Sequence, residues 1–112
     1  MSDCLFCKIV AGEIPSNKVY EDEQCLAFYD IDPQAPTHPL VIPKAHIGSV
    51  AEVTGDNSAV VAHIFEVIAK VTKELGLDSY RVVSNIGEQA GQSVHHLHFH
   101  VLSGRDMTWP PG

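Results

Sequence analysis

The segment from Ser93 to Leu102, SVHHLHFHVL, alternates histidine with apolar residues and constrains the fold more than any other part of the sequence. His96, His98 and His100 stand two residues apart, with an apolar residue in each gap. Because successive side chains of a β-strand point to opposite faces, a strand here places all three imidazoles on one face. The apolar residues then line the other face, where they can pack on a core. The segment therefore predicts a strand with one buried face and one face directed into a cleft.

Length and composition indicate one globular domain. The chain has 112 residues, of which 45% are hydrophobic and 19% charged, and this length favours a single domain over residues 1–112. The formal net charge is -7, whereas binding to a nucleic-acid backbone needs a basic surface. No apolar run approaches membrane-spanning length. We therefore expect neither a nucleic acid nor a membrane as partner, while a small anionic ligand in a local pocket remains compatible with the charge.

The cysteines and the N-terminus bear on the cellular compartment. Three cysteines are an odd number, and the N-terminus lacks the basic patch and hydrophobic segment of a secretory signal. The cysteines are therefore predicted to be reduced thiols or metal ligands rather than a disulfide framework. We expect a cytoplasmic protein.

Residues 57–75 are the best helix candidate. Gly76 is predicted to end this helix. A shorter helix is predicted near the N-terminus, where Asp3 can cap it and Gly12 and Pro15 can end it. The apolar positions of the long helix recur at helical spacing and form one stripe; they are Val60, Val61, Ile64, Val67, Ile68, Val71 and Leu75.

Strand-like segments surround the long helix. Pro39 and Pro43 cannot donate to a ladder, so we expect them at the ends of their strand or on an edge. The strands come in runs with hairpin-like connections, which favours an antiparallel sheet of about five strands and an α+β fold. The predicted strands are 18–22, 25–31, 39–44, 80–87 and 93–102.

Two kinds of chemistry could use three imidazoles on one face. In the first, they bind a metal, because alternating histidines on a strand are a zinc-ligand arrangement. In the second, one imidazole is a nucleophile and the others position it and its substrate. A metal hydrolase usually adds a carboxylate base, and this segment contains no Asp or Glu. The loop GEQAGQS favours the second, because Gly87, Gly91 and Ser93 can bring backbone N–H groups and a hydroxyl close to phosphate oxygens.

The sequence HHLHFHVL matches the signature of the histidine triad (HIT) family, in which three histidines alternate with apolar residues. The segments LFCKIVAGEIP, LAFYDIDPQAPTHPLVIPKAHI and GQSVHHLHFHVLSGRDMTWPPG resemble the Hint branch of this family, the nucleotide-binding phosphoramidases. The resemblance covers nearly the whole chain. It implies the HIT-like α+β fold, with a five-stranded antiparallel sheet, one long helix, a short N-terminal helix and a two-fold dimer.

The resemblance also implies a mechanism. His98 would attack the α-phosphorus of a purine nucleoside phosphoramidate, and a neutral imidazole is a good nucleophile near pH 7. The backbone carbonyl of His96 would hold the second ring nitrogen of His98. His100 would donate to the phosphate, and Ser93 would contact a phosphate oxygen or the leaving nitrogen. His38 would adjust the protonation of the other histidines, and catalysis would need no cofactor.

A nucleotide site follows from the same resemblance. Asp30 would accept hydrogen bonds from the ribose hydroxyls, although a solvated acid at the end of a strand is the alternative. Positions around the purine are apolar and could equally be ordinary core; they are Leu5, Phe6, Ile9, Phe28, Ile31 and Leu40. The phosphate would be held by Asn85, Gly91, Gln92 and Ser93 together with His98 and His100.

Cys4, Cys7, His46 and His96 form a second candidate constellation. Some members of the family carry a structural zinc on equivalent residues, and two cysteines with two histidines are a suitable tetrahedral set. Close Hint relatives often lack these cysteines, and a C-x-x-C pair can also be two small buried residues in a helix. Zinc is therefore an open expectation, and its role would be structural. Cys25 lies in an apolar strand and is most simply a buried thiol.

Three further residues need an assignment. His95 is out of phase with the other histidines of its segment, so it should face elsewhere and take no part in catalysis. His63 lies in the long helix and has no visible partner in the sequence. In the Hint branch the WPPG tail packs near the active site of the partner subunit, so the resemblance places Trp109 near the neighbouring site of a homodimer.

Other functions remain open at this stage. A dinucleoside-polyphosphate hydrolase would come from another branch of the same family. A nucleotide-binding adaptor would bind a purine monophosphate without turnover. A zinc hydrolase is the least favoured, and the sequence does not distinguish adenine from guanine.

Overall fold

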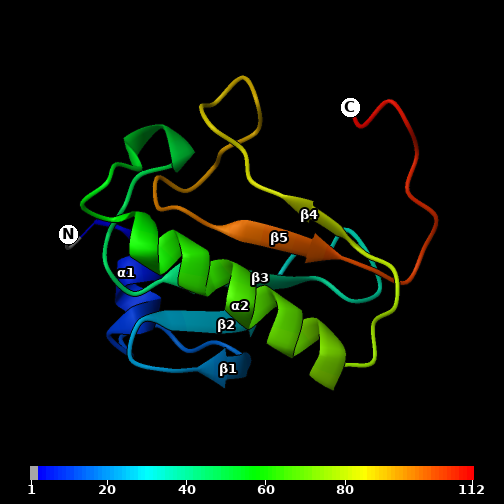
Figure 1. Ribbon diagram of the computed structural model, residues 1–112, viewed down its shortest axis with the longest axis horizontal. Coiled ribbons are helices and arrows are strands. Elements are labelled where there is room, and N and C mark those ends of the chain that lie inside the picture. Colours follow the sequence, from blue (N-terminus) through cyan, green and yellow to red (C-terminus); the bar gives the residue numbers. More distant parts are fainter. Residues whose placement is uncertain (1–2) are drawn as a thin grey trace.

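The computed structural model describes residues 3–112 as one sheet with helices on its faces (Figure 1). Five antiparallel strands form this sheet in the order β1-β2-β3-β5-β4. The predicted α+β fold, with one long and one short helix, is confirmed. In chain order the elements are α1 (Leu5–Val10), β1 (Lys18–Glu21), β2 (Cys25–Tyr29), β3 (Pro39–Pro43), the 3₁₀ helix η1 (Val50–Glu52), α2 (Ser58–Glu74), β4 (Arg81–Val83) and β5 (Phe99–Leu102). Within the described range, no helix combines the length and the apolar character needed to cross a membrane.

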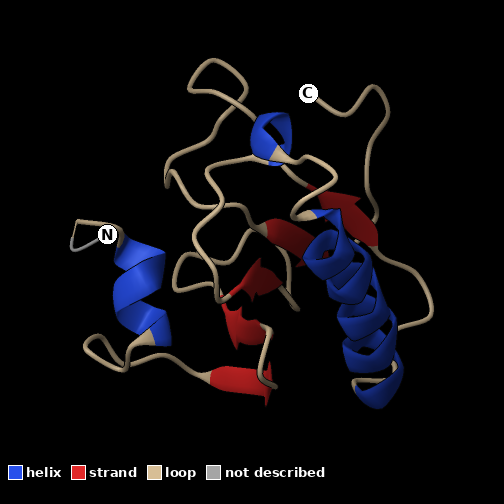
Figure 2. Cartoon of the chain, turned by 60° about the vertical axis from the view of Figure 1, so that its left-hand side comes forward, coloured by secondary structure: helices blue, strands red, loops and turns tan. Residues whose placement is uncertain are grey.

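The two faces of the sheet are covered by different helices (Figure 2). On one face α2 packs against the sheet, and Leu97, Phe99 and Val101 belong to this core. On the other face, Phe6 and Ile9 of α1 pack against the opposite side chains of β2 and β3. The alternation in the histidine segment therefore has a direct consequence. Its apolar residues face α2, as predicted, so its histidines face the side of the sheet that α1 covers only in part.

β3 is the central strand of the sheet, and β2 lies beside it. Pro39 and Pro43 stand at the two ends of β3, as expected for residues that cannot donate to a ladder. Cys25 begins β2, opposite Pro43, and is fully buried. Burial raises the pKa of its thiol to about 12. Cys25 is thus the buried thiol that the sequence predicted.

α2 closely follows its prediction. The helix begins at Ser58 and ends at Glu74, one residue inside the predicted range at each end. Gly76 follows with a φ of 72°, a left-handed conformation that other residues rarely adopt, and this ends the helix. Ile64 and Val71 lie fully buried on the apolar stripe.

α1 begins differently from its prediction. The cap is Cys4 and not Asp3, because the Cys4 thiol accepts a hydrogen bond from the backbone N–H of Cys7 at 3.3 Å. The thiol thus replaces the carboxylate that the sequence suggested. The end of the helix agrees with the prediction, since Gly12 follows it with a φ of 80°. This cap places the two cysteines next to each other at the start of the helix.

β5 is shorter than the predicted strand. It begins at Phe99, so His96 and His98 precede it. The reason lies in the backbone partners: the N–H of His96 donates to Val94, and that of Leu97 donates to Ile47. These bonds belong to a turn and a loop and not to a ladder. Side-chain alternation nevertheless continues through this extended segment, because Leu97 and Phe99 share the core under α2.

His63 has a partner that the sequence did not reveal. Its Nε2 lies 2.6 Å from Asp22 Oδ2, and its Nδ1 lies 3.3 Å from the carboxylate of Glu66. Partial burial raises the pKa of Asp22, but bonds from His63 and from the backbone N–H groups of Gln24 and Cys25 outweigh it and hold this pKa well below its usual range. The hydrogen bond to Asp22 raises the pKa of His63. The pair ties α2 to the turn between β1 and β2.

Replacing His63 with glutamine should lower thermal stability most at mildly acidic pH. The raised pKa of His63 contributes stability below the ordinary histidine pKa, and this is lost as pH rises through the folded value. The lowered pKa of Asp22 contributes stability above the ordinary aspartate pKa, and this is lost as pH falls. The contributions of His63 and of Asp22 to the stability of the fold are both present between about pH 4.5 and 6. The Tm difference between wild type and His63→Gln should therefore be larger near pH 5.5 than near pH 9; equal differences would contradict the charge pairing.

Candidate active site

Two neighbouring cavities lie beside the histidines on the α1 face of the sheet. One has a volume of about 300 Å³ and a mainly apolar lining, and we call it the apolar cavity. The other has a volume of about 440 Å³ and carries most of the polar side chains, and we call it the polar cavity. His100, Asp30 and Ser93 border both, while His98 borders the apolar cavity. A ligand with an apolar part and a polar part could therefore span the two cavities with its junction at the histidines.

His98 is oriented by its own backbone neighbourhood. Its Nδ1 donates a hydrogen bond to the backbone carbonyl of His96 at 2.6 Å. The proton of a neutral ring is then on Nδ1, so Nε2 carries a free lone pair. The ring is only 5% exposed, and the edge of Phe6 packs against it with 5.0 Å between ring centroids. His98 is thus held in the tautomer and the orientation that a nucleophile needs.

His38 and His100 form a directed hydrogen-bond relay. The backbone N–H of Gln34 donates to His38 Nδ1 at 3.0 Å, so the proton of a neutral His38 is on Nε2. His38 Nε2 lies 2.9 Å from His100 Nδ1 and donates to it. The Nε2–H of His100 is then left as a donor. Asp30 Oδ2 lies 3.6 Å from His38 Nε2 and adds a negative charge beside the relay.

Burial keeps these imidazoles neutral. Burial, together with the neighbouring His98 and His38 as potential like charges, lowers the pKa of His100 to about 4. Burial likewise lowers the pKa of His38, against an opposing effect of Asp30. At neutral pH both rings therefore hold a single proton. This supports the hydrogen-bond directions derived from the geometry.

The apolar cavity brings together the residues predicted for a nucleoside. Asp30 lies at its rim, and Ile31 is 97% exposed beside it. The predicted apolar positions that line the cavity are Leu5, Phe6, Ile9, Phe28, Ile31 and Leu40. Sequence reasoning missed Ile14, Pro15 and Val94, which also line it. These three residues could not be selected from the sequence, because a loop sequence does not show which of its side chains fold back over a strand.

The polar cavity brings together the residues predicted for the phosphate. Asn85, Gly91 and Ser93 line it beside His100. Gly91 has a φ of 102°, and a Cβ at this position would lie 3.4 Å from Asn85 Nδ2. A glycine therefore suits both the backbone conformation and the close approach to the amide. Asp32 and Gln34, which the sequence analysis did not select, line the same cavity.

Gln92 lies outside the linings of both cavities. Its Oε1 accepts from the backbone N–H of Gly87 at 2.9 Å, and its Nε2 donates to the carbonyls of Gly48 and Val94. The side chain therefore braces the glycine-rich loop from within. The structure does not bring this residue together with the other predicted nucleotide contacts.

His95 points away from the other histidines of its segment. Its side chain is 72% exposed, and its Nε2 lies 3.3 Å from a carboxylate oxygen of Glu52. It lines neither the apolar nor the polar cavity. This agrees with the expectation that a residue out of phase with His96, His98 and His100 faces elsewhere.

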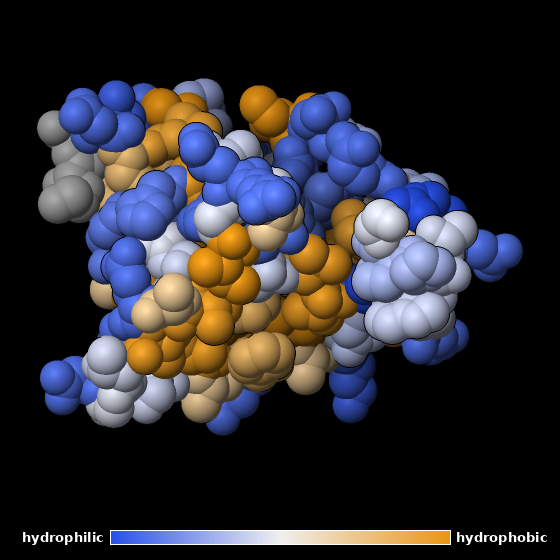
Figure 3. All heavy atoms as spheres, turned by 90° about the horizontal axis from the view of Figure 1, so that it is seen from above, coloured by the Kyte–Doolittle hydropathy of each residue, from blue (hydrophilic) through white to orange (hydrophobic). Residues whose placement is uncertain are grey.

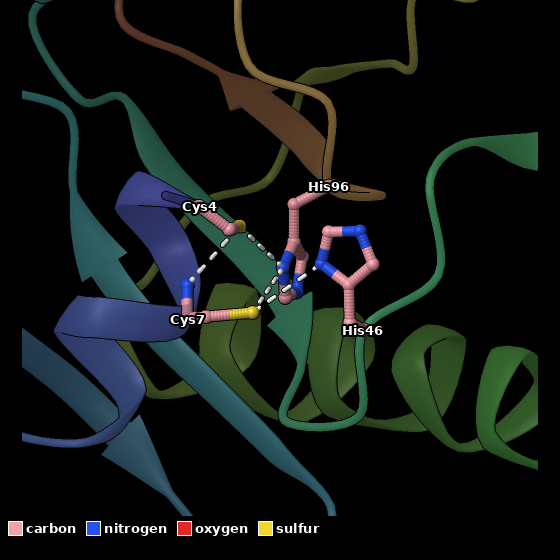
Figure 4. A group of neighbouring side chains, drawn as sticks. All are labelled: Cys4, Cys7, His46 and His96. Carbon is pink, nitrogen blue, oxygen red and sulfur yellow. Dashed lines mark hydrogen bonds between the residues drawn. The ribbon is translucent and has the colours of Figure 1, made fainter. Parts of the chain in front are cut away.

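Cys4, Cys7, His46 and His96 converge at the start of α1 (Figure 4). Cys7 Sγ lies 3.3 Å from His46 Nδ1 and 3.6 Å from His96 Nδ1, and Cys4 Sγ lies 3.3 Å from His96 Nδ1. Tetrahedral zinc with ordinary bond lengths separates its ligand atoms by about 3.3 to 3.8 Å. His96 Nε2 donates to the carbonyl of Pro43 at 2.9 Å, so the lone pair of Nδ1 faces the sulfurs. The donor set and its spacing fit a zinc ion.

Comparison with known proteins gives a consistent result along the whole chain. The family model described as "Scavenger mRNA decapping enzyme C-term binding" (DcpS_C) matches residues 3–109. An uncharacterized HIT-like protein of Synechococcus elongatus is 47% identical over 111 residues, which cover 98% of this chain and 97% of the relative.

Solved structures give the same result. A HIT family hydrolase from Legionella pneumophila superposes with a TM-score of 0.95 and 51% identity, over 98% of this chain and all of the other. A histidine triad protein from Clostridium difficile superposes with a TM-score of 0.92 and 48% identity, over 96% of each chain. The fold is therefore the HIT fold. The chain belongs to the histidine triad family, and its likeness to these structures supports a hydrolase of the HIT superfamily.

Proposed function

We propose that this chain is a purine nucleoside phosphoramidate hydrolase of the Hint branch, with His98 as its nucleophile. One observation carries the proposal. His98 donates its Nδ1 proton to the carbonyl of His96, which leaves Nε2 with a free lone pair, and the ring lines the apolar cavity together with His100 and Ser93, which border the polar cavity as well. A nucleoside fits the apolar cavity, and the phosphate then reaches the histidines.

The proposed reaction has two steps. In the first, His98 Nε2 attacks the α-phosphorus and forms an N–P bond, while the P–N bond to the amine breaks and the leaving nitrogen takes up a proton. In the second, water attacks phosphorus, releases the nucleoside monophosphate, loses a proton and frees His98. The Nε2–H of His100 donates to a phosphate oxygen, and Ser93 and Asn85 supply further polar contacts. These donors stabilise the negative charge that grows in each transition state.

The rest of the nucleotide is bound by the rim and lining of the apolar cavity. Asp30 accepts hydrogen bonds from the ribose hydroxyls, and Phe6, Phe28 and Leu40 contact the purine. Phe6, Phe28 and Leu40 are apolar and already line the cavity without a ligand, as is usual for small-molecule sites. Catalysis needs no cofactor in this proposal, because both steps use the imidazoles and water.

The polar cavity bears on the main alternative, a dinucleoside-polyphosphate hydrolase. Asp30 and Asp32 line this cavity, and no Lys or Arg of the described chain does so. A polyphosphate leaving group would bring several negative charges beside these carboxylates. A phosphoramidate brings an amine instead. This charge pattern favours the phosphoramidase.

Trapping the covalent intermediate would test the proposal. The purified chain is mixed with an adenosine 5′-phosphoramidate, the reaction is quenched within the first turnovers, and the adduct is located by peptide mass spectrometry. We expect an adenylyl group on His98. An adduct on another residue would refute the mechanism, and AMP binding without any turnover would support a nucleotide-binding adaptor.

We also propose that Cys4, Cys7, His46 and His96 bind a structural zinc ion. The sulfur and imidazole donors are spaced for a tetrahedral ion, and Pro43 orients His96 from the far side. When bound, the metal would cross-link α1 to the loops that carry the two histidines. The three free cysteines suit a reducing compartment, which makes the cytoplasm the proposed location.

We also propose that two copies of the chain form a homodimer by pairing along β4. β4 is an edge strand of the sheet, and such edges favour pairing with another strand. Figure 3 looks onto this edge from above the view of Figure 1 and shows a hydrophobic area on it. Three large hydrophobic side chains are exposed in this region: Val82 in β4, Tyr80 just before β4, and Phe65 in α2. In such a dimer Trp109, which lies against β4, would stand near the partner's site.

Replacing Val82 with lysine should convert the proposed dimer into a monomer. The substitution puts a charge into the centre of the apolar edge, where pairing would have to bury it. Sedimentation velocity would report the mass in solution. Val50→Lys is the matched control, because Val50 is similarly exposed but lies in η1. A dimer that persists in Val82→Lys would place the interface elsewhere.

A further inference from the structure

A third cavity opens beside the start of α1 and gives access to one of the two cysteines there. It has a volume of about 410 Å³, and Cys4 and His46 line it, whereas Cys7 lies outside its lining. It also shares Ser93 with the apolar cavity. Cys4 and Cys7 are both partly exposed, in contrast to the fully buried Cys25. Cys4 is therefore the thiol that a small dissolved reagent reaches first.

Cys4 and Cys7 are spaced for a disulfide bond. One helical turn separates them, since the backbone N–H of Lys8 donates to the carbonyl of Cys4 at 3.0 Å. Residues three apart in a helix have Cα atoms about 5 Å from each other, which lies within the range that disulfides span. The two sulfurs belong to a group of ligand atoms that all lie within 4.8 Å of one another. Side-chain rotation and a small adjustment of this turn can therefore bring the sulfurs to bonding distance.

Oxidation of this pair by a hydroperoxide takes two steps. Cys4 Sγ attacks one peroxide oxygen, so an S–O bond forms, the O–O bond breaks, and the other oxygen leaves with the Cys4 proton, as water when the oxidant is hydrogen peroxide. Cys7 Sγ then attacks Cys4 Sγ, so the S–S bond forms, the S–O bond breaks, and the hydroxyl leaves with the Cys7 proton as water. The sulfurs lose two electrons, and the peroxide gains them. With a metal bound the sulfurs carry no protons, and two protons from solvent complete the reaction.

The turn that the disulfide would close carries a side chain of the candidate active site. Phe6 lies between the two cysteines, and its ring packs edge-on against His96 and His98, with centroid distances of 5.9 and 5.0 Å. Phe6 also lines the apolar cavity. An adjustment of the turn therefore moves a ring that contacts both the nucleophile and the proposed nucleoside site. The bridge would also remove both sulfurs as metal ligands, because a metal binds the thiolate.

We propose that Cys4 and Cys7 are a reversible redox site, which hydroperoxides oxidise to a disulfide and which weakens nucleotide binding when oxidised. The disulfide concerns the cysteines alone, while its effect on the nucleotide rests on the proposed function. A dithiol reductant returns the pair to thiols by thiol–disulfide exchange. Cys25 takes no part, because it is fully buried in β2.

Hydrogen peroxide added to the purified protein, with its metal content left as it is, would test this. We expect the mass of the chain to fall by that of two hydrogen atoms and peptide mapping to link Cys4 to Cys7. Zinc bound before the treatment should be released in step with the disulfide, as a colorimetric chelator would show. The Kd for AMP, measured by calorimetry, should rise by about fivefold, the factor that one displaced aromatic contact accounts for. Dithiothreitol should reverse the change in mass and in Kd.

Three variants separate the roles of these residues. Cys25→Ala is the matched control, because it removes the third thiol and should still form the disulfide. Cys7→Ser should stop at a sulfenic acid on Cys4, which dimedone traps, whereas Cys4→Ser should form no adduct at the same peroxide dose. In Phe6→Leu the disulfide should form, but the Kd for AMP should change by less than about twofold on oxidation.

The opposite outcomes are equally distinct. A protein that forms no disulfide in excess peroxide, or one that pairs Cys25, would overturn the redox site. A Kd for AMP that is equal in the reduced and the oxidised protein would overturn the coupling to the nucleotide. Reduced protein that binds no AMP would instead refute the proposed nucleotide site, and the mass measurement would still decide whether the disulfide forms.

Discussion

Replacing His98 with alanine should lower kcat for phosphoramidate hydrolysis by about 10⁴-fold or more. The variant lacks the atom that forms the bond to phosphorus, and no neighbouring ring can substitute. His100 Nδ1 accepts from His38, and His96 Nδ1 faces the cysteine sulfurs. A fluorogenic adenosine phosphoramidate would measure the rate. AMP binding, measured by calorimetry, should stay within about tenfold of wild type, because the apolar cavity keeps most of its lining.

His95→Ala is the matched control for this variant. It removes an imidazole from the same segment, but one that is 72% exposed and outside the two cavities, so turnover should stay within about twofold. A His98→Ala variant that binds AMP and keeps the wild-type rate would refute covalent catalysis. A wild type that binds AMP and turns over nothing would identify an adaptor.

Replacing Cys7 with serine should abolish zinc binding and destabilise the fold. Cys7 Sγ contacts both His46 and His96, so its loss removes the ligand that links the other donors. An ion that binds only the folded chain stabilises it by about 4 kcal/mol when its free concentration is a thousand times its Kd. We expect stoichiometric zinc in wild type by elemental analysis, none in Cys7→Ser, and a loss of stability of about this size in chemical unfolding.

Cys25→Ala is the control for the metal measurement. Cys25 is the third free thiol, fully buried in β2 and outside the zinc constellation. This variant should keep its zinc even if its core packs less well. Wild-type protein that holds no zinc when purified without chelators, and whose stability does not respond to added zinc, would refute the metal site.

Much of the fold was predictable because its signals are local. The apolar stripe of residues 57–75 predicted α2 to within one residue, and the prolines of β3 marked the ends of that strand. The start of β5 was not predictable in this way. Leu97 donates to Ile47, fifty residues away in sequence, and no local pattern shows that this bond replaces a ladder. The contact of His63 with Asp22 could not be predicted for the same reason, since the two residues are 41 positions apart in the sequence.

The candidate site was predictable where residue type and spacing suffice. The alternation indicated His98 and His100, and the glycine-rich loop indicated Gly91 and Ser93, whereas Asn85 was implied by the resemblance to the Hint branch. Asp32 and Gln34 were missed, because polar residues in a turn-rich loop are ordinary in a sequence. Only the fold shows that they line the polar cavity beside His100.

The alternation in residues 96–101 also limits how this segment can change in evolution. Leu97, Phe99 and Val101 fill the core under α2, while His98 and His100 serve the cavities on the other face. Because neighbouring residues face opposite sides, inserting or deleting one residue here would exchange the two sets. Imidazoles would enter the core and apolar side chains would enter the cavity, so folding and chemistry would be lost in a single event. Changes in length can therefore be tolerated only outside the segment, for example in the loop that precedes it.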